Sequence, residues 1–204
     1  MKTDKRGRVI IRIYPKIKKS ELRPGDILLF YYGNKLTQFH GRWRKKKYGR
    51  STLPPYHAAI VYKLTSKDVI ILDPEISTSL SFLHEYLKKK NNRIDIVRFE
   101  ASRPQRRAIQ AKIKEIGTKE GFYDWKGYFA FISQMPCLGW LKVIKPSKKT
   151  FFCSDASTYA VHSSTNIRVS PRSANKTAPV DNQLYGLDHH KLYTVKKRGE
   201  SYDI

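Results

Sequence analysis

The sequence has few cysteines, few acidic residues and no long hydrophobic run. Its only two cysteines are Cys137 and Cys153, which are too few for a disulfide framework, so we expect reduced thiols. No apolar run reaches about 18 residues, and no apolar segment of a secretory signal follows the basic start. We therefore expect a protein made in the cytoplasm, without a signal peptide or a transmembrane helix. Association with a phage or virion, or a peripheral position on a membrane, stays open.

The shortage of acidic residues makes the chain strongly basic. Its 204 residues include 17 Asp and Glu against 41 Lys and Arg, which gives a formal net charge of +24. Hydrophobic residues make up 40% and aromatic residues 12% of the chain, which is too much for a disordered tail. The length fits one domain with one core. We predict a basic N-terminal extension over residues 1–21, with one strand as an option, and a single domain over residues 22–204.

A cluster of basic residues interrupts this domain, as an insert at about residues 40–55. Trp43 and Tyr48 are interleaved with the cations, and the pattern is typical of an exposed loop that attracts a polyanion. An anionic polymer, an anionic membrane surface or nucleic acid would fit, and so would a solvated loop that only raises solubility. No known signature of a sequence-specific nucleic-acid reader accompanies the cluster. The candidate anion-binding residues are Arg42, Arg44, Lys45, Lys46, Lys47 and Arg50.

Short apolar segments bounded by turn residues predict a sheet. Other segments have apolar residues at the spacing of a helix. One helix accepts Pro104 in its first turn, carries an apolar stripe and stops at Gly117. Residues 125–144 are interrupted by polar residues and proline, so a helix with an irregular stretch is favoured over a membrane span. Residues 163–182 have a loop composition. The predicted strands are Val9–Tyr14, Ile27–Tyr32, His57–Tyr62, Val69–Leu72, Ile94–Phe99 and Leu192–Val195, and the stripe comprises Ala108, Ile109, Ala111, Ile113 and Ile116.

Cys153 begins a further predicted helix, with Ala156, Tyr159 and Ala160 on one face. A thiol at a helix amino terminus lies at the positive end of the helix dipole, which favours the thiolate. Such a thiolate becomes catalytic when an imidazole exchanges protons with it and a polar group orients that imidazole. His57 is the candidate base, because it opens an apolar strand in which its ring has no packing role.

The candidate orienting acids are Asp73, which closes the next strand, and Glu75, two residues later. Simpler structural roles compete with this interpretation, since a cysteine beside two Phe residues is often a buried small hydrophobe. The histidines show no metal-ligand spacing. We therefore predict neither a metal nor a cofactor.

Four motifs in this order carry a resemblance to a known family. They are Gly25-Asp26-Ile27-Leu28, His57-Ala58-Ala59-Ile60-Val61, Tyr123-Asp124 and Phe152-Cys153-Ser154-Asp155. Over roughly residues 22–185, the chain resembles the circularly permuted branch of the NlpC-type papain-like cysteine hydrolases, which includes YiiX-like proteins and to which lecithin retinol acyltransferase is similar. The resemblance implies an α+β, permuted papain-like fold with a central antiparallel sheet packed against helices and a nucleophilic cysteine at a helix N-terminus.

The resemblance also implies roles for single residues. Cys153 is the expected nucleophile, His57 the general base, and Asp73 or Glu75 the third polar residue. The Tyr123-Asp124 pair is expected to shape the site, although a capping Asp beside a packed Tyr fits equally well. Backbone N–H groups at the start of the helix, around Ser154, are expected to form an oxyanion hole. The chain departs from the family at Asp155, where Glu is more common, and at Ala156-Ser157, where Leu-Val usually follows.

These assignments predict a cysteine hydrolase that cleaves an amide bond, such as one in cell-wall peptide, through a thioester intermediate. A lipid-directed acyltransferase or esterase would use the same residues, with residues 125–144 on a membrane surface. A peptide or isopeptide bond in a protein partner is a further possible substrate. The rival from another class is a non-catalytic basic module of a phage or virus that binds nucleic acid or an anionic membrane.

Overall fold

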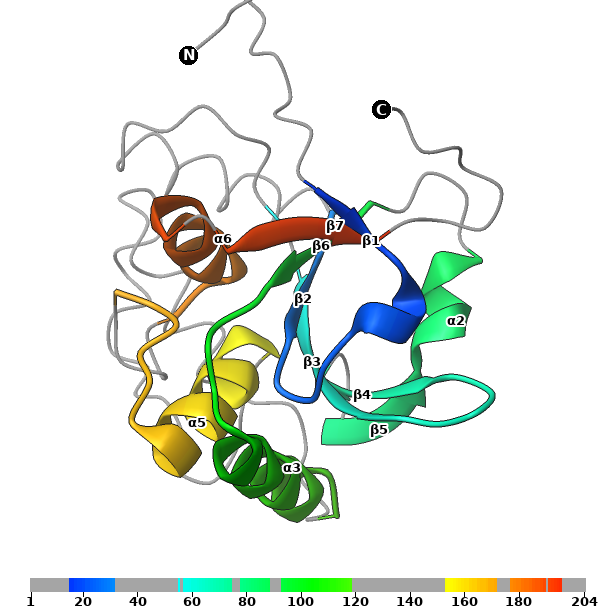
Figure 1. Ribbon diagram of the computed structural model, residues 1–204, viewed down its shortest axis with the longest axis horizontal. Coiled ribbons are helices and arrows are strands. Elements are labelled where there is room, and N and C mark those ends of the chain that lie inside the picture. The colour runs from blue at the N-terminus through cyan, green and yellow to red at the C-terminus, as the bar shows by residue number, and fades with distance from the viewer. Residues whose placement is uncertain are drawn as a thin grey trace, which may run out of the picture.

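A seven-stranded mixed sheet with helices on both faces forms an α+β fold (Figure 1). The computed structural model describes residues 15–31, 55, 57–74, 78–88, 93–118, 153–171, 177–189 and 191–195. The strands are β1 (Lys16–Ile17), β2 (Ile27–Phe30), β3 (His57–Leu64), β4 (Val69–Pro74), β5 (Thr78–Phe82), β6 (Ile94–Val97) and β7 (Leu192–Val195). The helices are a 3₁₀ turn η1 (Lys19–Glu21), α2 (Leu83–Leu87), α3 (Arg103–Thr118), α5 (Cys153–Thr165) and α6 (Pro179–Asp188).

The strand order is β1-β7-β6-β2-β3-β4-β5. Strand β2 lies in the middle and pairs antiparallel with β3 and with β6. The prediction of an antiparallel sheet holds for every pairing among the described strands except that of β1 with β7, which is parallel. The two strands lie near opposite ends of the chain, so no tight turn constrains their relative direction. The register that matters for the site pairs Phe30 of β2 with His57 of β3.

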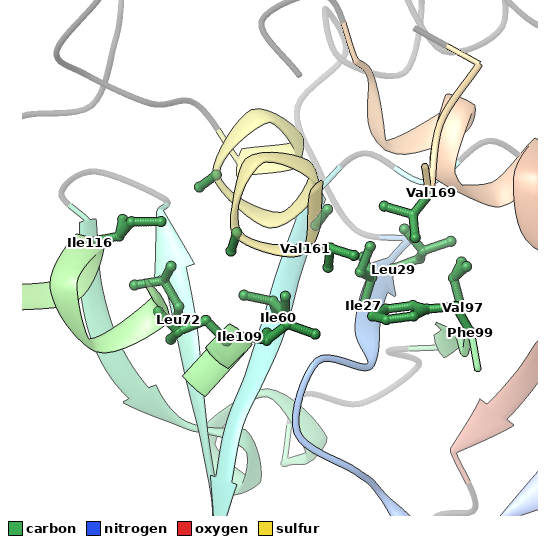
Figure 2. Packing of buried hydrophobic residues seen from close by; sticks show 14 of the residues in the cluster. Ile27, Leu29, Ile60, Leu72, Val97, Phe99, Ile109, Ile116, Val161 and Val169 are labelled. Carbon is green, nitrogen blue, oxygen red and sulfur yellow. The ribbon is translucent and has the colours of Figure 1, made fainter. Parts of the chain in front are cut away.

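The core has two layers because both faces of the sheet are covered. In β2, Ile27 and Leu29 face the layer that contains α3 and α5, whereas Leu28 and Phe30 face the layer that contains α2. This explains why β2 is a continuous apolar run without alternation. Figure 2 shows side chains of α3 and α5 packing onto Ile60 and Leu72 of the sheet. Helices α3 and α5 lie side by side on this face (Figure 1).

Helix α3 confirms the predicted helix but corrects two details. Ile109, Ile113 and Ile116 are buried, whereas Ala108 and Ala111 are exposed, so the buried stripe is narrower than predicted. The helix also does not stop at Gly117 but ends at Thr118. A Cβ at residue 117 would lie 3.1 Å from Leu72 Cδ1 and 3.2 Å from Leu80 Cγ. Glycine here therefore lets the end of α3 approach the sheet closely.

Helix α5 begins at Cys153, as predicted, and buries Ala156 and Ala160. Tyr159 does not share their buried face: it is exposed, and the ammonium of Lys112 lies 5.9 Å from its ring centroid. The sheet, α3 and α6 surround α5 on most sides.

Several predicted segments differ from the structure or lie outside the described residues. The loop predicted over residues 163–182 is wrong at both ends, because α5 extends to Thr165 and α6 begins at Pro179. Strand β5 and helix α2 were not predicted. The predicted strand Val9–Tyr14, the basic insert and residues 125–144 lie outside the described residues. Within the described part of the chain, no helix has the length and apolar character needed to cross a membrane.

Candidate active site

Cys153 is the first residue of α5 and is 7% exposed. Ala156, Ala160 and Val161 fix the helix against the core, so the position of the sulfur is set by the packing of the whole element. The first N–H groups of a helix have no partner within the helix. The backbone at Cys153 and Ser154 is therefore a source of donors next to the sulfur.

His57 is the first residue of β3, and its ring contacts both Asp73 and Cys153. Nε2 of the ring lies 2.5 Å from Asp73 Oδ1, and the Cys153 side chain is near enough to the ring to raise its pKa. Since Asp73 occupies Nε2, Nδ1 is the nitrogen left for the sulfur. The side chains of His57 and Asp73 are 12% and 2% exposed, so water has little access to their contact.

The surroundings of His57 favour the protonated ring. Burial lowers its pKa, but the charge and hydrogen bond of Asp73, together with the contact to Cys153, outweigh that effect and raise the pKa to about 10. The ring is therefore an imidazolium at neutral pH. A protonated ring beside the sulfur is the partner that a nucleophilic thiolate requires.

Tyr86, which lies on α2, is a further member of the cluster formed by Cys153, His57 and Asp73. It was not identified from the sequence. Its hydroxyl donates a hydrogen bond to Asp73 Oδ2, so each carboxylate oxygen has a partner. The Phe30 ring lies beside both rings, with centroids 5.6 Å from His57 and 5.1 Å from Tyr86. Helix α2 has five residues, too few to show a periodic signal, so nothing in the sequence marked Tyr86.

The predicted site residues separate into three groups. Cys153, His57 and Asp73 come together, whereas Glu75, the alternative acid, lies outside the described residues. The Ser154 hydroxyl donates to the carbonyl oxygen of Thr177 at 2.6 Å, which ties α5 to the segment before α6, so only the Ser154 backbone remains for the predicted oxyanion hole. Tyr123, Asp124 and the basic insert (Arg42, Arg44, Lys45, Lys46, Lys47 and Arg50) also lie outside the described residues.

The Gly25-Asp26 motif lies at the other end of β2 and has a structural role. Gly25 has a φ of +90°, a conformation that favours glycine. The Asp26 carboxylate accepts a hydrogen bond from the Arg23 backbone and pairs with the Arg98 guanidinium at 2.7 Å. This motif therefore shapes the turn into β2.

Comparison with solved structures finds a similar fold. The crystal structure of the metalloprotein yiiX from Escherichia coli O157:H7, DUF1105, matches with a TM-score of 0.53 and 13% sequence identity, covering 86% of this chain and 97% of that one. At this identity the match shows the fold alone. No protein-family model matches the sequence, and no curated protein matches it.

The description of that protein as a metalloprotein raises the question of a metal centre here. Among the residues that the structure describes, no group of three or more His, Cys, Asp or Glu side chains is arranged to hold a metal ion. His84 is engaged by Asp68 through Nδ1, and Asp73 is engaged by His57 and Tyr86. The donor set in this part of the chain does not fit a metal centre. What the comparison establishes for this chain is an α+β fold like that of the yiiX protein.

Proposed function

We propose that this chain is a cysteine hydrolase that cleaves an amide bond through Cys153, His57 and Asp73. The observation that carries the proposal is that one largely buried imidazole is bonded to a carboxylate and lies near a thiol. These three groups come from β3, β4 and α5, which are separate elements of the fold. An imidazole placed between a sulfur and an orienting acid is what nucleophilic catalysis by cysteine requires.

In the first half of the proposed reaction, the thiolate sulfur of Cys153 attacks the amide carbonyl carbon. The resulting oxyanion is held by backbone N–H groups at the start of α5, each worth on the order of 3 kcal/mol in the barrier. The C–N bond breaks as His57 gives its proton to the leaving amine. The products are a thioester on Cys153 and a free amine.

In the second half, neutral His57 accepts a proton from water as the water oxygen attacks the thioester carbon. The C–S bond breaks and releases a carboxylic acid. Sulfur and imidazolium are then restored as a pair. Asp73 keeps Nε2 of His57 directed away from the sulfur throughout.

Thiol reactivity at low pH tests the proposal. We expect iodoacetamide at pH 6 to alkylate Cys153 much faster than Cys137, with peptide mass spectrometry reporting each site separately. His57→Ala should abolish the difference, because the imidazolium that stabilises the thiolate is lost. His162→Ala is the matched control, since His162 is an exposed histidine in the last turn of α5.

A second measurement addresses catalysis itself. Incubation with an activated ester such as p-nitrophenyl acetate should leave an acetyl group on Cys153, visible in the mass of the intact protein, and His57→Ala should form it about a hundredfold more slowly. Equal alkylation of both cysteines, unaffected by His57→Ala, together with no acyl adduct on Cys153, would contradict the proposal.

A further inference from the structure

A cavity of about 470 Å³ lies at the end of the sheet away from Cys153. It is formed where the turn into β2, the segment after β6, the start of α3 and the start of β7 meet. The register pairs Ile27 with Val97 at this end of β2 and Phe30 with His57 at the other. Strand β2 thus separates the two places by about 10 Å, at roughly 3.3 Å per residue. The cavity is not part of the candidate active site.

Cationic side chains dominate the wall of this cavity. Arg23, Arg98, Arg106 and Lys191 line it, together with one carboxylate, that of Glu100. The buried carboxylate of Asp26 lies behind the wall and pairs with Arg98. Four cations thus meet two anions, which leaves an excess of two positive charges.

The arginines are held in place while keeping donors available. Arg106 donates from Nη1 to the carbonyl oxygen of Pro24 at 2.6 Å and from Nη2 to that of Phe99 at 3.1 Å, so both of these bonds go to uncharged acceptors. Among the described residues, the Arg23 guanidinium has no hydrogen-bond or ion-pair partner. Burial lowers the pKa of Arg106; Asp26 opposes this effect, and the charges of Arg23 and Arg98 add to it. These like charges therefore repel one another across the cavity.

Lys191, the remaining cation, forms an ion pair that a ligand can replace. Lys191 Nζ is 2.6 Å from Glu100 Oε1, and the Glu100 side chain is 89% exposed. Exposed ion pairs contribute little to stability, so Lys191 can leave Glu100 for a ligand at small cost. Tyr193 is half-buried and also lines the cavity, and its ring, 5.4 Å from the guanidinium carbon of Arg98, offers apolar surface beside the cations.

We propose that this cavity binds a phosphate group, either free phosphate or the phosphate of a small phosphomonoester. Guanidinium groups match the geometry of phosphate oxygens through paired hydrogen bonds. A phosphomonoester carries a charge of about −1.5 to −2 near neutral pH, which balances the excess of two positive charges. The cavity also falls within the roughly 300–1,000 Å³ typical of small-molecule sites, so it has room for an organic group beyond the phosphate.

Calorimetric titration of the full chain with inorganic phosphate, at an ionic strength held constant with sodium chloride, tests the proposal. We expect saturable binding of one phosphate, weakened about tenfold or more by Arg23→Gln, because a charge-assisted hydrogen bond is lost. Arg23 is exposed, so this variant should fold. Arg107→Gln is the matched control: it removes the same charge from an exposed residue of α3 that does not line the cavity.

A titration with glycerol 3-phosphate separates the two sources of the phosphate. Tighter binding than that of inorganic phosphate identifies a phosphomonoester as the ligand, and equal affinity identifies the phosphate group alone. Both results support the site, provided that Arg23→Gln weakens binding and Arg107→Gln does not. Equal weakening by both variants, or no saturable binding, overturns the proposal. Neither outcome bears on alkylation of Cys153, so the two proposals can fail separately.

Discussion

The His57 ring has two polar neighbours, Asp73 and Cys153. Asp73 fixes the Nε2 side, and the Cys153 contact then falls to the other nitrogen. Because Tyr86 occupies the second oxygen of the Asp73 carboxylate, that carboxylate is held at both ends. We therefore expect the orientation of the proposed base to depend on Tyr86.

Removal of the Tyr86 hydroxyl tests this positioning role. In Tyr86→Phe, one oxygen of a carboxylate that is 2% exposed loses its donor, which should lower the free energy of unfolding by about 1–3 kcal/mol. The carboxylate can then rotate, so alkylation of Cys153 at pH 6 should slow several-fold. Urea unfolding and alkylation kinetics measure the two effects.

Tyr62→Phe is the matched control for this variant. Tyr62 lies on β3 in the same sheet and is half-buried, and no hydrogen bond of its hydroxyl is found among the described residues. This control should change neither quantity. If Tyr86→Phe were as stable and as reactive as the wild-type chain, Tyr86 would have no positioning role.

At the scale of elements, the contact between the end of α3 and the sheet depends on Gly117. In Gly117→Val, the new side chain meets Leu72, which is fully buried, and Leu80 on the edge strand β5. Leu80 is partly exposed and can move, but Leu72 cannot. We expect overpacking to lower the free energy of unfolding by about 1–3 kcal/mol.

Ala111→Val on the same helix provides the comparison for Gly117→Val. Ala111 is exposed, so this substitution carries only the lower helix propensity of valine, below about 1 kcal/mol. Chemical denaturation of both variants measures the difference. If Gly117→Val were no less stable than Ala111→Val, the close approach of α3 to the sheet would not depend on glycine.

Elements with a strong local signal could be predicted from the sequence. Strand β2 is an apolar run after a Pro-Gly-Asp turn, and α3 has buried isoleucines at helical spacing. Helix α2 is too short for a periodic signal, and β5 has exposed apolar residues at Leu80 and Phe82, which blur its pattern. Gly117 was misread as a helix stop because tertiary packing, not local conformation, explains it.

At the scale of the whole molecule, the candidate site depends on contacts between residues far apart in the chain. The sequence placed Cys153 at the start of a helix, which is confirmed, and Asp73 at the end of a strand that extends one residue further, to Pro74. Tyr86 could not be found, because only the packing of α2 beneath the sheet brings it to Asp73. The excess positive charge around the cavity could not be predicted from the sequence either, because its arginines come from different segments.

The proton on His57 should make the stability of the fold depend on pH. Its pKa is raised from 6.5 to about 10 in the folded chain, so folding favours the protonated ring. The resulting stabilisation is fully present below pH 6.5, declines as the pH rises toward 10 and is absent above that. The difference in unfolding free energy between wild type and His57→Gln should therefore shrink over this range, by at most about 1.4 kcal/mol per pH unit.

Urea unfolding of both proteins at several pH values between 6.5 and 10 measures this difference. When the unfolding free energy of the variant is subtracted from that of the wild type, the contributions of lysines and tyrosines that titrate in both proteins cancel. A difference that stayed constant or grew with pH would contradict a raised pKa of His57.

Strands β3 and β4 and helix α5 contribute different groups to the candidate site, and this has an evolutionary consequence. Adjacent strands supply the proposed base and its orienting acid, whereas α5 contributes the sulfur and the backbone N–H groups of the proposed oxyanion hole. A single codon change at position 153 would therefore silence the proposed chemistry while leaving the paired strands and their bonds in place. Gene duplicates that lost the sulfur in this way would inherit an intact scaffold, free to diverge into pseudoenzymes.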